Sequence, residues 1–315
     1  MSKYLALFIA LLLSITTSWA EALLPRVKRD IPQRGVSPFR SGQVRLTTTR
    51  LESEVLGLLA ELGLEVHPNA KHRISVELQT DIEGLPQGNE EAYKLSITSD
   101  HISLSAYTET GLYRGLQTLS QLYERGEWTA RVILDWPAFP WRGFMMDVGR
   151  TYIPLEELKQ EIDLLARFKV NVFHWHLTEN EAWRLESKLY PKLNDRASMT
   201  RMAGRYYTQR EARELVQYCK ARRVLLIPEI DMPGHSAAFE RALGYGMQTE
   251  RGKQTLKALI KEVCEVFDVP YLHIGTDEVQ FTDKTFVPEM VAYVRSLGKK
   301  VISWAPGWSY QIGEV

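Results

Sequence analysis

The chain has 315 residues, of which 44% are hydrophobic and 25% are charged, a composition that excludes wholesale disorder and a length that suggests about two domains. Thirty-nine basic residues balance 39 acidic ones, so the sequence carries no global electrostatic signature of a nucleic-acid or anionic-membrane binder. Two cysteines, Cys219 and Cys264, are too few for a disulfide scaffold or a cysteine-rich zinc site.

The first twenty residues have the order of a secretory signal peptide. Lys3 precedes a continuous apolar run over residues 4–13, and small residues follow up to Ala20 or Ala22. The run is too short to span about 30 Å of hydrocarbon. We therefore expect residues 1–20 to be a signal peptide and the mature protein to be exported, either periplasmic or secreted, with no membrane span.

The next region predicts a small α+β domain behind an irregular lead-in. Residues 21–40 contain three prolines and a glycine among basic residues, which favours irregular structure. Leucines at helical spacing predict helices over residues 51–64 and 108–124, and alternating apolar residues predict a strand over 74–78 and a hairpin formed by 93–97 and 102–106. No catalytic groups cluster over residues 41–136, so we expect an accessory domain.

Beyond Pro137 and Pro140 the hydrophobic pattern changes and predicts alternating strands and helices. Short apolar runs predict five strands, over residues 143–148, 171–177, 224–229, 271–276 and 301–304, with amphipathic helices between them. The pattern allows a (β/α)8 TIM barrel or an open doubly wound sheet. Chemically capable side chains end several of the strands, and no glycine-rich phosphate turn is present, so we expect a barrel over residues 137–315.

Asp277 and Glu278 are adjacent carboxylic acids where the fourth expected strand ends. The chain turns there, so both side chains can reach one pocket, and adjacent Cα atoms are about 3.8 Å apart. Two carboxylates this close cannot ionise independently, so one pKa should rise. This arrangement suits a proton donor beside a charged stabiliser, and a solvated pair of loop residues is the alternative.

Glu229 and Asp231 form a second acidic pair, two residues apart at the end of the third expected strand. They share a face if the strand continues, and we favour an ion pair or a loop support over catalysis. His235 follows on a Pro-Gly turn and could tune a neighbouring carboxylate, or could be a satisfied structural group.

His174 and His176 suggest a different chemistry. Histidines two apart on a strand point the same way and could share a metal ion, as in metal-dependent amidohydrolases. That class needs further histidines at strand ends and a late aspartate, and here only His273 and Asp277 are available. The match is incomplete, and we predict no metal site.

Arg150 and two tryptophans are candidates for binding a sugar. The arginine follows the end of the first expected strand by two residues, and its fixed donors suit hydroxyl groups or carboxylates, although a salt bridge to Asp147 is the alternative. Trp183 and Trp304 could form apolar walls against a sugar ring, and each could equally be a core residue.

Four ordered motifs in the barrel region resemble glycoside hydrolase family 20, the β-N-acetylhexosaminidases. The motifs are WRGFMMDVGR at 141–150, NVFHWHLTENEAWR at 171–184, PEIDMPGH at 228–235 and HIGTDE at 273–278. The helix expected over residues 112–122 resembles that of the family's accessory α+β domain. The resemblance covers nearly the whole chain from about residue 41 and implies a TIM barrel.

The resemblance implies a role for each matching residue. Glu278 matches the general acid/base, and Asp277 matches the aspartate that orients and stabilises the 2-acetamido group of the substrate. Arg150 matches an arginine that binds hydroxyls of the terminal sugar, Trp304 a tryptophan lining the acetamido pocket, and His235 and Glu179 residues that support the acid/base. The family uses the substrate's own amide as nucleophile and needs neither metal nor organic cofactor.

The sequence departs from the family pattern in three ways. Thr276 replaces a usual glycine, which implies a tighter backbone, and Glu179 replaces a usual aspartate, which adds a methylene to the support. Residues 141–315 are 315 − 140 = 175 residues and supply about five strands. A complete (β/α)8 barrel takes about 250 residues, so we expect a fragment of a longer protein.

The sequence therefore predicts an exo-acting β-N-acetylhexosaminidase. Its partner would be an oligosaccharide or glycoconjugate with a terminal β-linked N-acetylglucosamine or N-acetylgalactosamine, and not a nucleic acid. A non-catalytic glycan-binding module and a metal-dependent amidohydrolase-like barrel stay open as alternatives.

Overall fold

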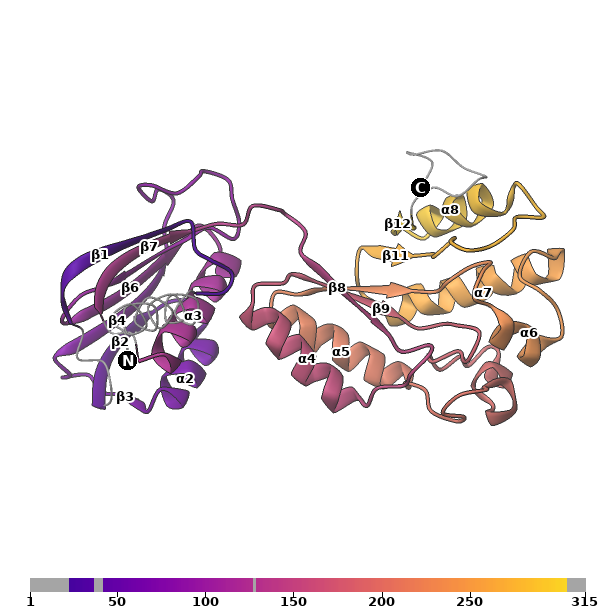
Figure 1. The fold of residues 1–315 in the computed structure, drawn as a ribbon, viewed down its shortest axis with the longest axis horizontal. Coiled ribbons are helices and arrows are strands. Elements are labelled where there is room, and N and C mark those ends of the chain that lie inside the picture. The colour runs from indigo at the N-terminus through magenta and orange to yellow at the C-terminus, as the bar shows by residue number, and fades with distance from the viewer. Residues whose placement is uncertain (1–22, 37–41, 127–128, 305–315) are drawn as a thin grey trace, which may run out of the picture. The chain divides into compact units, whose positions relative to one another are not determined.

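A computed structural model describes residues 23–36, 42–126 and 129–304 (Figure 1). The expected signal peptide over residues 1–20 lies outside these ranges. The chain divides into two compact units, which are residues 1–140 with 167–169, and residues 141–166 with 170–315. Within the described ranges, no helix combines the length and the apolar character that a membrane crossing requires.

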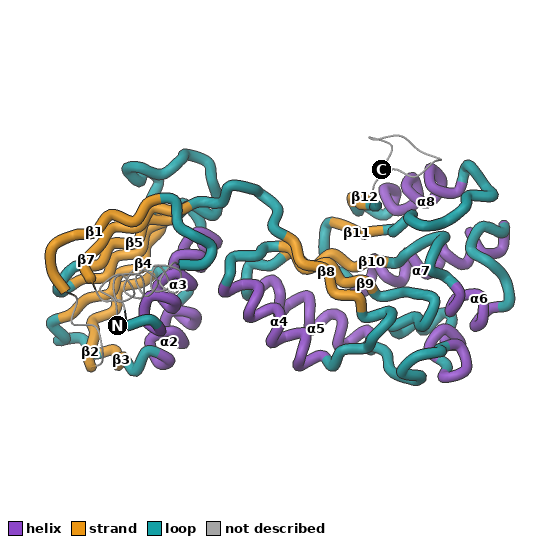
Figure 2. The backbone as a smooth tube through the Cα atoms, in the orientation of Figure 1, coloured by secondary structure: helices purple, strands orange, loops and turns teal. Residues whose placement is uncertain are grey.

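The described residues of the first unit form a seven-stranded mixed sheet and two helices (Figures 1 and 2). Its strands are β1 (Arg29–Val36), β2 (Gly42–Thr48), β3 (Leu64–Val66), β4 (His72–Leu78), β5 (Tyr93–Ile97), β6 (His101–Ala106) and β7 (Thr129–Asp135). They lie in the order β1-β7-β5-β6-β4-β2-β3, antiparallel from β1 to β6 and parallel from β6 to β3. The expected hairpin of β5 and β6 is confirmed.

Helices α2 (Glu52–Glu61) and α3 (Glu109–Glu124) pack on this sheet. Thr108 begins α3 by accepting a hydrogen bond from the Gly111 N–H at 3.2 Å. The helix lies very close to β6, because a Cβ added at Gly115 would stand 2.2 Å from Leu104 Cδ1. The leucines predicted to face the core are all buried, at Leu112, Leu116, Leu119 and Leu122.

The structure corrects the expectation of an irregular lead-in over residues 21–40. Arg29–Val36 form strand β1, which pairs with β7 at the edge of the sheet. Proline suggested a break, but Pro32 lies on an edge strand, where only one side of the backbone must pair with a neighbour. Strands β2, β3 and β7 were also not expected, because none shows a long run of alternating apolar residues.

A buried charged cluster stabilises the interior of the first unit. Lys169 Nζ lies 2.7 Å from Asp135 Oδ2 and donates to the Tyr93 hydroxyl at 2.8 Å. Tyr93 donates to the same carboxylate oxygen at 3.1 Å and contacts the Thr118 hydroxyl at 2.6 Å. The Lys28 N–H donates to the other carboxylate oxygen at 3.1 Å. Both oxygens of the buried acid therefore have partners.

The second unit is a five-stranded parallel sheet whose strands lead into helices. Its strands are β8 (Gly143–Asp147), β9 (Val172–His176), β10 (Leu225–Glu229), β11 (Tyr271–His273) and β12 (Lys300–Ile302). Its helices are α4 (Leu155–Arg167), α5 (Gln209–Ala221), α6 (Ala237–Leu243), α7 (Glu250–Val266) and α8 (Phe286–Ser296), with short 3-10 turns η1 (Pro191–Asn194) and η2 (Arg196–Ser198). All five predicted strands and the four predicted helices are confirmed, with ends shifted by a few residues.

The strand order identifies the architecture of this unit. The strands lie side by side in chain order, from β8 to β12, and each pairs in parallel with the next (Figure 2). An open doubly wound sheet reverses its order at a switch point, whereas a barrel adds each strand on the same side. The described residues therefore form part of a (β/α)8 barrel, as predicted.

The register of the strands aligns four polar residues at the carboxyl end of the sheet. Asp147 of β8 lies opposite His176 of β9, which lies opposite Glu229 of β10, which lies opposite His273 of β11. Residues in register on neighbouring strands share a face. The intervening Trp175 faces the helix layer, where its ring lies 4.7 Å from that of Tyr207.

Both cysteines are free thiols, Cys219 in α5 and Cys264 in α7. Burial raises the pKa of Cys219 to about 12 and that of Cys264 to about 11. Both therefore stay protonated at neutral pH and behave as packing residues rather than nucleophiles.

Candidate active site

Glu229 lies at the centre of the row of polar residues and is surrounded by three histidines. Its Oε2 atom is 2.7 Å from His174 Nε2 and 2.6 Å from His176 Nδ1, and its Oε1 atom is 3.0 Å from His273 Nδ1. Its side chain is fully buried. Burial alone would raise the pKa of Glu229, but contacts with the three histidines hold it well below its usual range. Glu229 is therefore a buried anion.

Three of these groups, His174, Glu229 and His273, also lie close enough to be considered as metal ligands. Their nitrogen and oxygen atoms are separated by 2.7 and 3.0 Å, which are hydrogen-bond or ion-pair distances. Ligand atoms around a tetrahedral zinc ion, with bonds of about 2.0–2.1 Å, stand about 3.3 Å apart. The groups contact one another directly, so the geometry favours a polar cluster over a metal centre.

Glu179 contacts both Arg150, the candidate for binding a sugar, and His235, the residue expected to support the acid/base. It follows β9, and its Oε1 atom lies 2.8 Å from His235 Nδ1 and accepts the Asn180 N–H at 2.9 Å. Its Oε2 atom lies 3.1 Å from the Arg150 guanidinium and 3.4 Å from His176 Nε2. Although burial opposes it, these partners lower the pKa of Glu179. The carboxylate of Glu179 therefore contacts His235 despite the extra methylene in its side chain.

A glycine makes room for Glu179. A Cβ added at Gly149 would stand 2.6 Å from the Glu179 Cβ atom and 3.2 Å from its backbone nitrogen. Any side chain at this position would push the carboxylate away from His235 and Arg150. The glycine after the first barrel strand thus fixes where the supporting acid sits.

Arg150 is held by two carboxylates, and part of its side chain is exposed to solvent. Its guanidinium lies 2.5 Å from Asp147 Oδ2 and 3.1 Å from Glu179 Oε2, and the backbone N–H of Arg150 donates to Asp147 Oδ1 at 2.9 Å. The side chain is 46% exposed. The salt bridge to Asp147 that the sequence offered as the alternative is present, and it orients an arginine with further N–H donors, so the binding of sugar hydroxyls stays a prediction.

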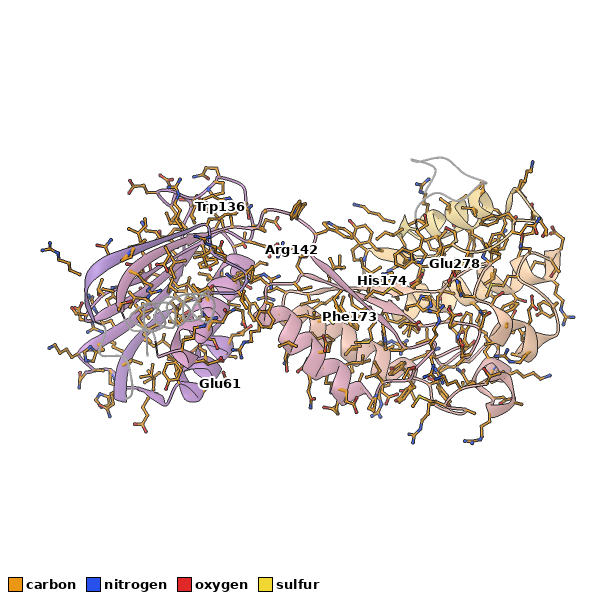
Figure 3. All side chains as sticks on the ribbon, viewed as in Figure 1. Glu61, Trp136, Arg142, Phe173, His174 and Glu278 are labelled. Atoms are coloured by element: carbon orange, nitrogen blue, oxygen red, sulfur yellow. The ribbon has the colours of Figure 1, made fainter. Side chains whose placement is uncertain are left out.

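Glu278 lies next to His235 and points largely into solvent. Its Oε2 atom is 3.5 Å from His235 Nε2, and its side chain is 75% exposed (Figure 3). Burial alone would lower the pKa of His235, but Glu179, Asp231 and Asp277 raise it. The imidazole of His235 therefore stands between the buried carboxylate of Glu179 and the exposed carboxylate of Glu278.

Asp277 turns inward towards Asp231. One oxygen of each carboxyl group and one nitrogen of His235 all lie within 4.8 Å of one another. Asp231 Oδ2 and Asp277 Oδ1 are buried and have no hydrogen-bond partner. Burial, with the charges of Glu229 and Asp277, raises the pKa of Asp231 to about 8. A raised pKa at Asp231 is expected when two acids share a site.

The backbone that carries these acids is strained. Gly275 has φ 67°, Thr276 has φ 85° and Glu278 has φ 50°. A Cβ at Gly275 would stand 1.7 Å from Asp231 Oδ1, and the Thr276 N–H donates to that oxygen at 3.2 Å. A positive φ at a β-branched residue is an outlier and costs of order 1–3 kcal/mol. The threonine that departs from the family's glycine is therefore the strained one.

The chain after Glu278 is anchored by residues around the start of α7. The Gln248 side-chain amide donates to the Gln280 carbonyl at 3.0 Å and accepts the Thr282 N–H at 2.8 Å. Lys253 lies 2.9 Å from the Asp283 carboxylate. The acidic pair therefore sits on a short segment that is fixed on both sides.

Trp304 stands beside the histidine cluster. Its ring centroid lies 5.3 Å from that of His174 and 4.8 Å from that of His273, and its backbone N–H donates to the Gly275 carbonyl at 3.0 Å. Trp183, the other candidate wall, is only 2% exposed and is a core residue.

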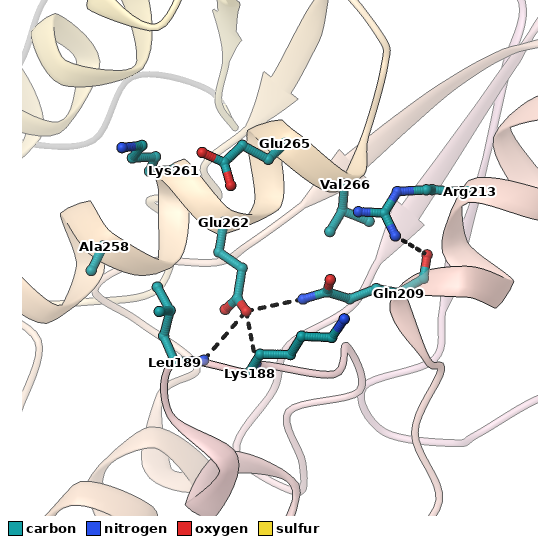
Figure 4. Close-up of a pocket in the computed structure, with 9 residues that line it drawn as sticks. All are labelled: Lys188, Leu189, Gln209, Arg213, Ala258, Lys261, Glu262, Glu265 and Val266. Atoms are coloured by element: carbon teal, nitrogen blue, oxygen red, sulfur yellow. Dashed lines mark hydrogen bonds between the residues drawn. The ribbon is translucent and has the colours of Figure 1, made fainter.

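A separate cavity of about 330 Å³ lies between α5, α7 and the loop at Lys188 and Leu189 (Figure 4). Its central acid, Glu262, accepts hydrogen bonds from the Lys188 N–H at 2.7 Å and the Gln209 amide at 2.9 Å. It also accepts the Ser187 hydroxyl at 2.7 Å. Glu262 therefore holds the loop in place, and the cavity contains none of the predicted site residues.

The structure brings the six predicted site residues to one end of the second unit's sheet: Glu278, Asp277, Arg150, Trp304, His235 and Glu179. It adds His176, Glu229 and Asp231, which the sequence had offered only as metal ligands or loop supports. A His-x-His strand followed by a strand ending in Glu-x-Asp indicated that histidines and acids lie at neighbouring strand ends. The register that places His176 opposite Glu229 is a tertiary property and could not be predicted from this pattern.

Two sequence models of one family match the chain. The model described as "Glycosyl hydrolase family 20, catalytic domain" matches residues 139–254, and "Glycosyl hydrolase family 20, domain 2" matches residues 25–136. Together they span most of both units. The catalytic-domain match ends before Asp277 and Glu278, so the assignment of the acidic pair depends on the geometry above.

Similar proteins point the same way. A Porphyromonas gingivalis beta-hexosaminidase is 34% identical over an alignment of 261 positions that covers 71% of this chain and 33% of that protein. The crystal structure of a Bacteroides fragilis beta-N-acetylhexosaminidase matches with TM-score 0.78 and 26% identity, covering 90% of this chain and 66% of that one. A Vibrio harveyi exo beta-N-acetylglucosaminidase in complex with N-acetylglucosamine matches with TM-score 0.77 and 26% identity, covering 92% and 56%. The chain thus spans only a third to about two thirds of these proteins.

Proposed function

The chain belongs to glycoside hydrolase family 20, and on that premise we propose that the protein is an exo-acting β-N-acetylhexosaminidase. It removes terminal N-acetylglucosamine or N-acetylgalactosamine from oligosaccharides or glycoconjugates. The observation that carries the proposal is the contrast within the acidic pair. Asp277 turns inward to Asp231, whereas Glu278 projects outward beside His235. Neighbouring acids with such different surroundings suit different roles.

In the first step Glu278 is the general acid. The carbonyl oxygen of the substrate's 2-acetamido group bonds to the anomeric carbon, while the bond from that carbon to the leaving oxygen breaks. The leaving oxygen takes the proton of Glu278. Asp277, which lies close to Asp231, stabilises the positive charge that develops on the oxazolinium ring. The attacking group is part of the substrate and so has a high effective concentration.

In the second step water opens the ring. Glu278, now a carboxylate, takes a proton from the water as its oxygen bonds to the anomeric carbon, and the acetamide is restored with net retention of configuration. Arg150 binds hydroxyl groups of the terminal sugar, and Trp304 lines the acetamido pocket. No step needs a metal ion or an organic cofactor.

Hydrolysis of aryl β-N-acetylglucosaminides by the full-length protein tests this activity. We expect turnover that a chelator does not reduce, and loss of turnover with the matching glucoside, which lacks the amide. Chelator-sensitive turnover would favour a metal-dependent reaction. Sugar binding without turnover would favour a glycan-binding module.

Two variants separate the roles of the acidic pair. Glu278→Gln should slow hydrolysis most for poor leaving groups, because these need the proton. Asp277→Asn should slow good and poor leaving groups alike, because it weakens the stabilisation of the ring. Full turnover in Asp277→Asn would contradict the substrate-assisted route.

We further propose that the protein is exported to the periplasm or secreted. The support is the order of Lys3, the apolar run over residues 4–13 and the small residues before Ala20. Mass spectrometry of the mature N-terminus tests it, and a mature protein that starts at Met1 in the cytoplasm would contradict it.

A further inference from the structure

A continuous chain of carboxylates and imidazoles links the interior of the barrel unit to the exposed acid. From the inside outward it runs from Glu229 to His176 at 2.6 Å and from His176 to Glu179 at 3.4 Å. It continues from Glu179 to His235 at 2.8 Å and from His235 to Glu278 at 3.5 Å. Acid and imidazole alternate at every step, so each link joins an acceptor to a donor.

His176 is the link whose role the proposed activity does not explain. It lies on β9 and is 3% exposed. Its Nε2 atom and Glu179 Oε2 are both buried, and neither has a hydrogen-bond partner of good geometry, yet they face each other at 3.4 Å. Leaving two such atoms unsatisfied is costly unless they attract each other as charges.

The surroundings of His176 require a cation. Its Nδ1 atom faces Glu229 and its Nε2 atom faces Glu179, and ionised carboxylates only accept hydrogen bonds, so both ring nitrogens must carry protons. Asp147 on β8 adds a third negative charge nearby, and His273 on β11 and Asp231 after β10 also face the ring. Burial alone would lower the pKa of His176, but Glu179 and Glu229 raise it to about 10.

We propose that His176 is a positioning residue for the acid/base. Fixed on Glu229, it holds the Oε2 atom of Glu179 together with Arg150 and so leaves the Oε1 atom of Glu179 for His235, which adjoins Glu278. His176 touches neither sugar nor reacting atoms. The inference rests on the proposed function, since it concerns proton donation by Glu278.

Two substitutions of His176 test its two contacts separately, the one with Glu229 and the one with Glu179. The amide nitrogen of asparagine can take the place of Nδ1, so His176→Asn keeps the contact with Glu229 and loses the one with Glu179. Glutamine reaches further and can take the place of Nε2, so His176→Gln keeps the contact with Glu179. His174→Asn is the control, because His174 lies on the same strand and its Nε2 atom contacts Glu229 at 2.7 Å, so this variant disturbs the same buried acid through another histidine.

The kinetic test compares kcat/KM for aryl N-acetylglucosaminides with good and poor leaving groups, using the full-length protein. We expect His176→Asn to slow the poor leaving group about tenfold more than the good one, because proton donation contributes mainly there. We expect His176→Gln to recover most of this difference and the affinity for N-acetylglucosamine to stay unchanged. His174→Asn should slow both substrates by a similar factor. Equal slowing by His176→Asn would overturn the proposal.

A second measurement does not depend on activity. Nitrogen-15 NMR of the histidine rings in the wild-type protein should show His176 with protons on both nitrogens at pH 8, and Glu179→Gln should lower its pKa. A neutral His176 at pH 8 would overturn the proposal even if His176→Asn failed to fold. A wild-type protein that released no aglycone would contradict the proposed function instead, and the NMR result would still decide the state of His176.

Discussion

Each unit of the molecule buries an acid, and the two acids are paired in different ways. Asp135 in the first unit is paired with Lys169 at 2.7 Å, and both of its oxygens have further partners. Glu229 in the second unit is surrounded by histidines, and its Oε1 atom lacks a hydrogen bond of good geometry. The first cluster is closed, whereas the second leads through His176 towards an exposed acid.

The difference teaches how a buried charge can serve structure or chemistry. Lys169 and its partners satisfy one another within the first unit. His176 has a donor nitrogen on each side, so it links the buried Glu229 to Glu179 and, through His235, to the exposed Glu278. The contrast can be tested by breaking each cluster and measuring a different property.

The largest expected effect is on the closed cluster. Lys169→Met leaves the buried Asp135 carboxylate without its cation, and such a loss destabilises a protein by about 3–5 kcal/mol. Chemical denaturation of the full-length protein measures the change, with hydrogen exchange at β5 and β6 to localise it. Lys220→Met is the control, since Lys220 and its partner Asp268 are 46% and 88% exposed, and it should have a much smaller effect. Equal effects would contradict the interpretation.

The second effect is a fall in stability of the second unit as the pH rises. The pKa of His176 is about 10 in the folded protein against an ordinary value of 6.5, so its stabilising contribution is complete below pH 6.5 and is lost as the pH rises towards 10. Asp231, whose pKa is raised to about 8, changes stability in the same direction.

At 1.36 kcal/mol per pKa unit, His176 alone accounts for about 3 kcal/mol between pH 6.5 and 9. Hydrogen exchange of β9 and β10 amides, corrected for the intrinsic rate, measures this change. Burial raises the pKa of Tyr93 well above its ordinary value, so the amides of β5 and β6 should hardly respond over this range. His176→Asn should flatten the profile of β9 and β10. A parallel decline in both units would contradict the prediction.

The third effect is the loss of stability when alanine replaces a glycine that has no room for a side chain. Gly149→Ala would force Glu179 aside and should cost about 1–3 kcal/mol and a large part of the activity. Gly143→Ala is the matched control, since its nearest neighbour would be 3.7 Å away, and it should change stability by less than about 0.5 kcal/mol. Gly115→Ala in the first unit should destabilise like Gly149→Ala, because it meets Leu104, but should leave the pH dependence of kcat/KM unchanged.

The smallest effect is a gain. Thr276→Gly relieves a residue at φ 85° and should stabilise the protein by about 1 kcal/mol. Thr285→Gly, at φ −88°, should be destabilising, because glycine there adds freedom to the unfolded chain and loses the hydrogen bond from the Thr285 hydroxyl to Asp283 at 2.7 Å. Thermal unfolding of both variants checks the sign, and a loss of stability in Thr276→Gly would mean that the threonine side chain contributes more than its backbone costs.

The barrel unit was largely predictable because its strands are buried on both faces. Apolar runs such as Val172–His176 and Leu225–Glu229 stand out from their surroundings, and the helices between them are amphipathic. In the first unit the edge strand β1 contains Pro32 and few apolar residues, so no pattern revealed it. Short edge strands depend on their neighbours and not on their own sequence.

The candidate site was predictable in its residues but not in its connections. The motif around Asp277 and Glu278 indicated the acidic pair, and the turn at Pro233-Gly234 indicated His235. The alignment of His176 with Glu229 depends on strand register, and the strain at Thr276 depends on a backbone angle. Both are tertiary properties that no local pattern encodes.

The anchoring of the chain around Asp277 and Glu278 has a consequence for substrate choice. On one side the Thr276 N–H is held by Asp231, and on the other the Gln280 carbonyl is held by Gln248. With its backbone pinned at both ends, Glu278 can follow an aglycone only by rotating about its own side-chain bonds. A glycosidic linkage would be cleaved only if its bridging oxygen lies within reach of these side-chain rotations. The fixed backbone of this segment would therefore restrict which linkages are hydrolysed.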